Sequence, residues 1–116
     1  FKLDISNVKE ILSDLFKENN RKLSINDIQS QVSKHFNINF ADLCSKRRSR
    51  SISRPRQVAM YLCKELTELS YPEIGKYFGG KDHATVIHGV NKIKNLSSTD
   101  KKIKRDIENL MSNLIS

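Results

Sequence analysis

Hydrophobic residues recur three and four positions apart along most of the chain, a spacing that is typical of amphipathic α-helices. No segment shows a convincing alternation of apolar and polar residues of the kind that predicts a β-strand. The pattern therefore predicts an all-α fold. The expected helices cover residues 6–19, 25–36, 56–69 and 72–78, a stretch that begins after Asp82, and a last stretch that follows the cap signals of Ser97–Thr99.

Residues that favour turns separate these predicted helices. Phe40 and Leu43 predict a short turn, and residues 45–53, in which Ser and Arg alternate without apolar periodicity, predict a loop. Pro55 suits the first turn of the next helix, where the missing N–H is not needed. Gly79–Gly80 end the short helix 72–78, because glycine adopts left-handed conformations that other residues resist.

The length of 116 residues suffices for one domain, or for one domain with an appended fragment. Because the chain begins with Phe1 rather than Met, we expect a piece of a longer protein. No run approaches the ~18 apolar residues of a membrane span, and no signal-peptide pattern is present. We therefore expect a soluble, cytoplasmic domain.

Almost all of the excess positive charge lies in one segment. The formal net charge is +8, and residues 43–64 contain seven basic residues and no acidic residue. Such a cluster is either a solvated loop or a surface that binds phosphates, and the cluster alone does not decide between them.

The segment that follows this cluster predicts a helix-turn-helix. A short helix, a glycine-containing turn and a second helix are the layout of such a DNA-binding motif, although a helical hairpin used only for packing has the same order. Helical spacing places Val86, Val90 and Ile93 of the second helix toward the core. Small or hydrogen-bond-donating side chains then face outward, namely Ala84, His88, Asn91 and Lys92. Asp82 can cap this helix, can accept a hydrogen bond from cytosine N4, or can do both.

Five short motifs in a fixed order resemble the C-terminal DNA-binding domain of the bacterial DnaA family. They are Ser45-Lys-Arg-Arg-Ser-Arg50, Arg54-Pro-Arg-Gln57, Pro72-Glu-Ile-Gly75, Gly79-Gly-Lys-Asp-His83 and Thr85-Val-Ile-His88, and the similarity extends over residues 24–115. The resemblance implies a compact helical domain with a helix-turn-helix over residues 23–116. It also implies that residues 1–22 are the end of an AAA+ lid with its connector helix.

The resemblance implies roles for individual residues in binding replication-origin boxes. It assigns to base reading Arg48 in the minor groove, and Tyr71, Pro72, Asp82, His83 and Ala84 in the major groove. It assigns to phosphate binding Lys46, Arg50, Arg56, Gln57, Lys64, Lys81 and Thr85. The chain departs from common family patterns at Tyr71, where many relatives have Leu, at Lys81, where Arg is common, and at Ala84, where well-known relatives have Thr. These departures affect the expected sequence preference more than the function.

Partners and cofactors follow from the same resemblance. It implies double-stranded origin DNA as the partner, with one monomer on each asymmetric box and oligomerisation through other domains. The sequence contains no G-x-x-x-x-G-K-[ST] phosphate loop, so we expect no cofactor in this fragment, with ATP bound only by the preceding AAA+ domain.

Three other functions are weaker. The amphipathic helix over residues 6–18 could contact acidic phospholipids, but its polar face carries Glu10, Asp14 and Glu18, with Asp4 just before it, and an anionic surface repels these acidic residues. Neighbouring Asp82 and His83 point about 100° apart on a helix, so an acid–base pair and an enzyme are not expected. A zinc site is not expected either, because its ligands would be unfavourably spaced, namely Cys44, Cys63, His83 and His88.

Overall fold

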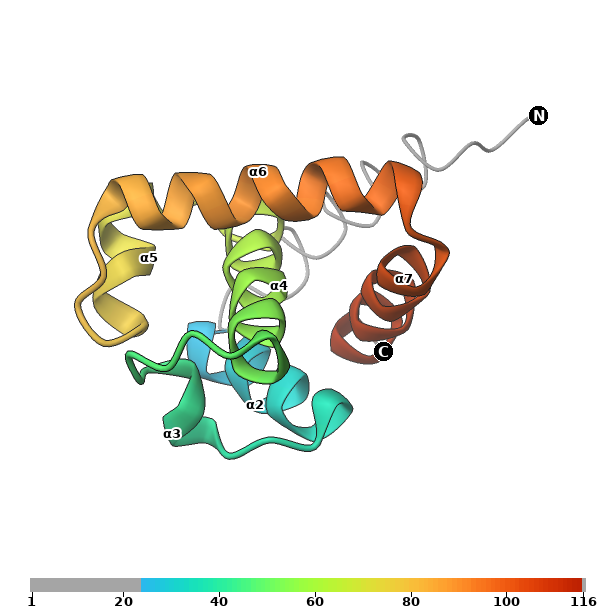
Figure 1. Cartoon of the computed structure of the whole chain (residues 1–116), viewed down its shortest axis with the longest axis horizontal. Helices are drawn as coiled ribbons and strands as arrows, with labels where there is room; N and C mark the ends of the chain where they lie inside the picture. The colour runs from blue at the N-terminus through green and yellow to red at the C-terminus, as the bar shows by residue number, and fades with distance from the viewer. Residues whose placement is uncertain (1–23, 116) are drawn as a thin grey trace.

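The computed structural model describes residues 24–115, which form six helices and no strand (Figure 1). The helices are α2 (Ile25–Phe36), α3 (Phe40–Leu43), α4 (Arg50–Leu66), α5 (Tyr71–Tyr77), α6 (His83–Thr99) and α7 (Lys101–Ile115). The prediction of an all-α fold is confirmed. The predicted helix over residues 6–19 and the domain boundary at residue 22 lie outside the described residues. In the described range, no helix is long and apolar enough to span a bilayer.

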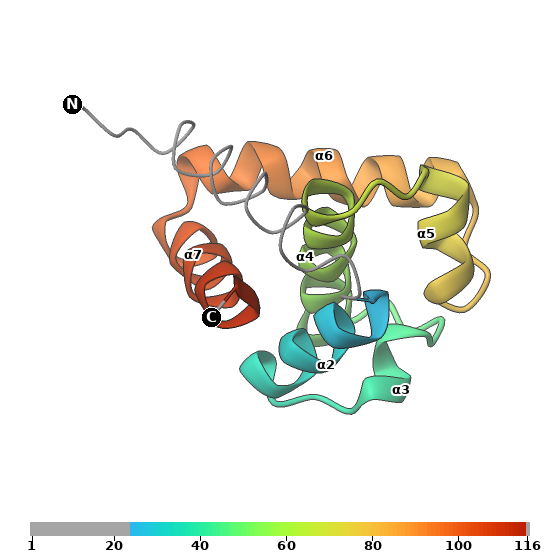
Figure 2. The same ribbon diagram turned by 180° about the vertical axis from the view of Figure 1, so that it is seen from behind.

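Helix α4 is the centre of the molecule. It packs against α2, α3, α5, α6 and α7, and the long helix α6 crosses it on one side while α2 lies on the other (Figures 1 and 2). Val58, Leu62 and Leu66 of α4 are at most 1% exposed. Because each fully buried side chain of this size contributes about 1.5–3 kcal/mol, this stripe makes α4 the main support for the elements around it.

Helix α4 begins six residues earlier than the sequence predicted. Residues 50–53 are helical rather than part of a loop, and Pro55 lies inside the helix. The physical reason is that the apolar stripe extends back to Ile52, which is only 5% exposed, so burial offsets the backbone hydrogen bond that Pro55 cannot donate. At its other end α4 stops at Leu66 instead of Leu69, with Thr67 as the C-cap.

Helices α5 and α6 form the predicted helix-turn-helix. Ser70 and Glu73 make a capping box at the start of α5, and the turn residues Gly79 and Gly80 both have positive φ angles. The turn folds tightly over α5, because the Lys81 N–H donates to the Gly75 carbonyl oxygen at 3.0 Å. A Cβ atom on Gly75 would lie 2.0 Å from the Lys81 oxygen, so this close approach requires glycine.

The last two helices meet at Asp100, not at Ser97–Thr99 as predicted. The hydroxyl groups of Ser97 and Ser98 donate to carbonyl groups inside α6 instead of capping a new helix. Asp100 Oδ1 accepts from the Lys102 N–H at 2.9 Å and caps α7. Helix α7 then returns toward α2, where His35 Nε2 lies 2.8 Å from Asp106 Oδ1.

Candidate nucleic-acid interface

The outward face of α6 is the most regular part of the candidate site. Val86, Val90 and Ile93 are at most 1% exposed, as the helical spacing predicted. The opposite side is exposed, and its residues are His83, Ala84, Thr85, His88, Asn91 and Lys92. Residues 83–99 include no acidic residue, so this face carries no charge that would repel phosphates.

Asp82 is the N-cap of α6. Its Oδ1 accepts a hydrogen bond from the Thr85 N–H at 2.8 Å. Hydrogen bonding to Thr85, first through the side chain and then through the backbone, holds the pKa of Asp82 below its ordinary value. The carboxylate is therefore charged at neutral pH and remains a hydrogen-bond acceptor on the surface. The capping role is confirmed, and it leaves the carboxylate accessible to a base.

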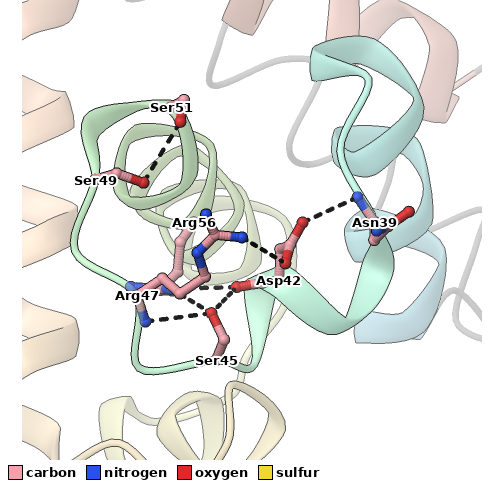
Figure 3. Close-up of polar contacts among 7 residues, drawn as sticks. All are labelled: Asn39, Asp42, Ser45, Arg47, Ser49, Ser51 and Arg56. Atoms are coloured by element: carbon pink, nitrogen blue, oxygen red, sulfur yellow. Dashed lines mark hydrogen bonds and ion pairs between the residues drawn. The ribbon is translucent and has the colours of Figure 1, made fainter.

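Residues 45–49, called the basic loop below, connect α3 to α4. Lys46 and Arg48 are exposed, and neither forms a hydrogen bond or ion pair with the described residues. Arg47 differs, because its Nη1 lies 3.7 Å from Asp42 Oδ1 and its N–H donates to Ser45 Oγ (Figure 3). The basic loop thus presents the charges of Lys46 and Arg48 to solvent, and Arg50 is exposed at the start of α4.

Arg56, which the resemblance assigns to phosphate binding, is buried in the structure. Arg56 is 7% exposed, and its guanidinium donates to the carbonyl oxygen of Leu43. It also donates to the carbonyl oxygen of Asp42 and to Ser45 Oγ (Figure 3). Burial lowers the pKa of Arg56, and the nearby Cys44 and Asp42 partly oppose this effect. These hydrogen bonds use Nε and Nη2 and hold the guanidinium against residues 42–45, while the phosphate contact expected for Arg56 stays a prediction.

Lys81 is also engaged within the protein. Its Nζ donates to the Ser45 carbonyl oxygen at 2.8 Å and to the Phe78 carbonyl oxygen at 2.9 Å. Partial burial lowers the pKa of Lys81, and the positive charge of Arg56 lowers it further. Lys81 therefore connects the turn of the helix-turn-helix to the basic loop.

The remaining predicted residues lie around α4 and α5. Lys64 Nζ sits 4.5 Å from the centre of the Tyr71 ring, which is half-buried and packs against the core. Pro72 is exposed in the first turn of α5. Gln57 is half-buried at the crossing of α4 with α6, beside Gly89. Lys64, Tyr71 and Pro72 thus form a group at the start of the helix-turn-helix.

Sequence reasoning missed two polar residues that hold this arrangement. Gln29 is 1% exposed, and its Nε2 donates to the Tyr77 carbonyl oxygen at 2.8 Å. A glutamine on the apolar stripe of a helix was the available signal, because a buried amide needs a partner. Ser45, which accepts from both Arg56 and Lys81, gave no such signal in the sequence.

The four residues considered for zinc are not gathered. Cys63 is buried in α4, and burial raises the pKa of its thiol. His83 and His88 are exposed on α6. Within residues 24–115 no three His, Cys, Asp or Glu side chains form a group that could hold a metal ion.

The chain matches a known family model and is similar to curated proteins over most of its length. The family model described as the bacterial dnaA protein helix-turn-helix matches residues 25–93. The chain is similar to the chromosomal replication initiator proteins DnaA of Ruegeria sp. (46% identical over 112 residues) and Ehrlichia ruminantium strain Gardel (48% over 113 residues), in each case over 97% of this chain. That of Zymomonas mobilis is 49% identical over 104 residues, 90% of this chain. The chain spans about a quarter of the length of these curated relatives.

Proposed function

Because the chain belongs to the bacterial DnaA helix-turn-helix family, we propose that it binds double-stranded DNA sequence-specifically at the boxes of a replication origin. In this proposal it is the DNA-binding part of a chromosomal replication initiator. The observation that carries the proposal is the exposed, acid-free face of α6 beside a basic loop that Lys81 ties to the same helix-turn-helix. A hairpin used only for packing would not need this exposed, donor-rich face.

In the proposed complex α6 enters the major groove with its N-terminal residues toward the bases. The Asp82 carboxylate accepts a hydrogen bond from cytosine N4, His83 contacts a base edge, and the methyl group of Ala84 meets a thymine methyl group. Tyr71 and Pro72, at the start of α5, supply further apolar contacts to thymine. Since Tyr71 is half-buried under Lys64, Pro72 offers the more accessible surface of the two.

The basic loop extends the proposed interface to a second groove. Arg48 enters the adjacent minor groove, where narrow A·T-rich segments concentrate negative potential. Phosphate contacts on either side come from exposed or half-buried residues, which are Lys46, Arg50, Gln57, Lys64 and Thr85. Such contacts set the register of the protein on the duplex without reading its sequence.

We also propose how many copies of the chain bind each box. One asymmetric box needs no two-fold partner, so we expect one monomer on each box in the bacterial cytoplasm, with ATP binding and oligomerisation left to other domains. The possible contact of residues 6–18 with acidic phospholipids involves residues outside the described range, and no observation favours it over DNA.

A titration followed by fluorescence anisotropy tests this function. The chain is titrated into a duplex with a DnaA-type box and into a scrambled duplex of equal length, at two salt concentrations. We expect the box to bind at least about a hundredfold more tightly at the higher salt, because counterion competition removes nonspecific binding first. Equal binding to both duplexes, lost in parallel as salt rises, would show only an electrostatic surface and would contradict sequence-specific recognition.

A further inference from the structure

Residues 42–45, called the junction below, comprise the end of α3 and the first residue of the basic loop, and they are held from two sides. Arg56 of α4 approaches from one side, with its Nε 3.2 Å from the Leu43 oxygen and its Nη2 3.1 Å from the Asp42 oxygen. The same Nη2 lies 3.3 Å from Ser45 Oγ. One buried guanidinium therefore fixes both the end of α3 and the first residue of the basic loop (Figure 3).

The turn of the helix-turn-helix holds the junction from the other side. Lys81 Nζ bridges the Ser45 and Phe78 carbonyl oxygens, and Cys44 Sγ lies 3.4 Å from the Tyr77 oxygen. Gly79 has φ of 83°, and a Cβ atom on it would lie 2.2 Å from the Cys44 oxygen. The backbone of the turn thus packs directly on the junction, and only glycine permits this approach.

We propose that Lys81 and Arg56 are positioning residues, which fix the basic loop relative to α6 so that Arg48 and the N-terminus of α6 form one preorganised surface. The inference rests on the proposed function, because its consequence is the simultaneous reading of two grooves. It differs from the family-based expectation, which gives both residues direct phosphate contacts.

A basic loop that is held in place before binding lowers the entropic cost of binding DNA. A free basic loop would lose conformational entropy when Arg48 enters the minor groove, and that loss would subtract from the affinity. A loop already held against the turn has lost this freedom during folding. Two reading elements held at a fixed separation also raise the effective concentration of the second once the first is bound. Lys81 and Arg56 therefore act on sequence-specific binding through Arg48.

A double-mutant cycle separates positioning from phosphate contact. Lys81→Met keeps an unbranched side chain of similar length and removes the ammonium group. We expect it to weaken box binding about tenfold in the otherwise unchanged chain, but by no more than about twofold when Arg48→Ala is already present. The same fold-loss in both backgrounds would overturn the proposal, because a direct phosphate contact acts independently of Arg48.

Lys46→Met is the matched control. Lys46 is an exposed lysine of the basic loop, and it has no hydrogen-bond or ion-pair partner among the described residues. It should weaken the box and the scrambled duplex by similar factors, as expected for a phosphate contact. Lys81→Met should weaken the box more than the scrambled duplex. A Lys81→Met profile that matches the Lys46→Met profile would contradict the positioning role.

A measurement without DNA keeps the inference separate from the proposed function. Backbone ¹⁵N order parameters of residues 45–49 are compared among the unchanged chain, Lys81→Met and Lys46→Met. We expect values near those of rigid backbone in the unchanged chain and in Lys46→Met, and a decrease toward about 0.6 or below in Lys81→Met. Unchanged values in Lys81→Met overturn the inference even if the box is bound specifically. A decrease supports the positioning of the loop even if the box is not preferred.

Arg56→Lys tests the contacts that Arg56 makes with the junction. It keeps the charge but replaces the planar fork of donors with a single ammonium group, which cannot reproduce the geometry toward Asp42, Leu43 and Ser45. We expect lower order parameters in the basic loop and weaker box binding, with circular dichroism showing that the helices remain. Unchanged loop order and unchanged box affinity would exclude Arg56 as a positioning residue.

Discussion

At the scale of single residues, Asp82 combines a structural role with a proposed recognition role. Its carboxylate caps α6 through the Thr85 N–H, yet the side chain is exposed at the tip of the helix-turn-helix. A carboxylate near phosphates is repelled unless it gains a specific hydrogen bond, so its presence here fits a contact with cytosine N4. Capping and reading therefore use the same charged form of the group.

The lowered pKa of Asp82 predicts how stability changes with pH. A carboxyl group whose pKa is lower in the folded state stabilises the fold above its unfolded pKa, about 3.9, and this contribution is lost as the pH falls through the folded pKa. We expect Asp82→Ala to lower the melting temperature at pH 7. The difference from the unchanged chain should shrink below about pH 4. Thermal unfolding followed by circular dichroism measures it, and a pH-independent difference would contradict the capping account.

Arg48 carries the clearest prediction about specificity. Arg48→Ala should weaken box binding by about 1–3 kcal/mol and should affect the scrambled duplex much less, because a minor-groove contact depends on groove width. Anisotropy titrations of both duplexes measure this difference. Arg105→Ala is the matched control, since Arg105 is exposed on α7 outside the proposed interface, and should change neither affinity appreciably. An equal loss on both duplexes would reduce Arg48 to a phosphate contact.

At the scale of elements, apolar periodicity predicted where helices lie better than where they begin. Helix α2 has the predicted bounds, because its cap and its stripe coincide. The predicted start of α4 was wrong, because Pro55 and the Ser/Arg alternation suggested a loop. The residue that decides the start is Ile52, a single buried side chain among polar neighbours. Only the packed fold shows that this single side chain is buried.

Ile52 tests the earlier start of α4. Ile52→Ala should destabilise the fold by about 2–4 kcal/mol, because it removes a buried side chain from the first turns of the helix. Ser51→Ala, at the neighbouring exposed position, should stay within about 0.5 kcal/mol. Urea unfolding gives both values. A negligible effect of Ile52→Ala would support the loop that the sequence had suggested.

Gly75 tests the tight turn between α5 and α6. Alanine normally stabilises a helix relative to glycine, but here its Cβ would meet the Lys81 oxygen at 2.0 Å. We expect Gly75→Ala to lower the free energy of unfolding, measured with urea, by about 1–3 kcal/mol or more. Lys76→Ala, at the next and exposed position of α5, serves as the control and should be close to neutral. Stabilisation by Gly75→Ala would show that the turn is looser than described.

At the scale of the whole molecule, charge counting indicated the candidate interface but did not assign a role to each charge. The basic segment 43–64 and the outward face of α6 were predictable, because charge and helical spacing are properties of the sequence alone. The internal use of Arg56 and Lys81 was not, because their acceptors are mostly backbone oxygens that approach only after α3, α4 and the turn have packed together. The fold therefore divides the basic residues of the candidate interface into exposed charges and charges that hold the junction.

The central claim is that one monomer reads both grooves of a single box. Methylation protection with dimethyl sulfate tests it in one experiment, because the reagent modifies guanine N7 in the major groove and adenine N3 in the minor groove. We expect protection of guanines where α6 lies and of adenines in the adjacent segment where Arg48 lies. Both should appear together as the chain is titrated. Protection confined to one groove, or spread evenly along a scrambled duplex, would contradict the account.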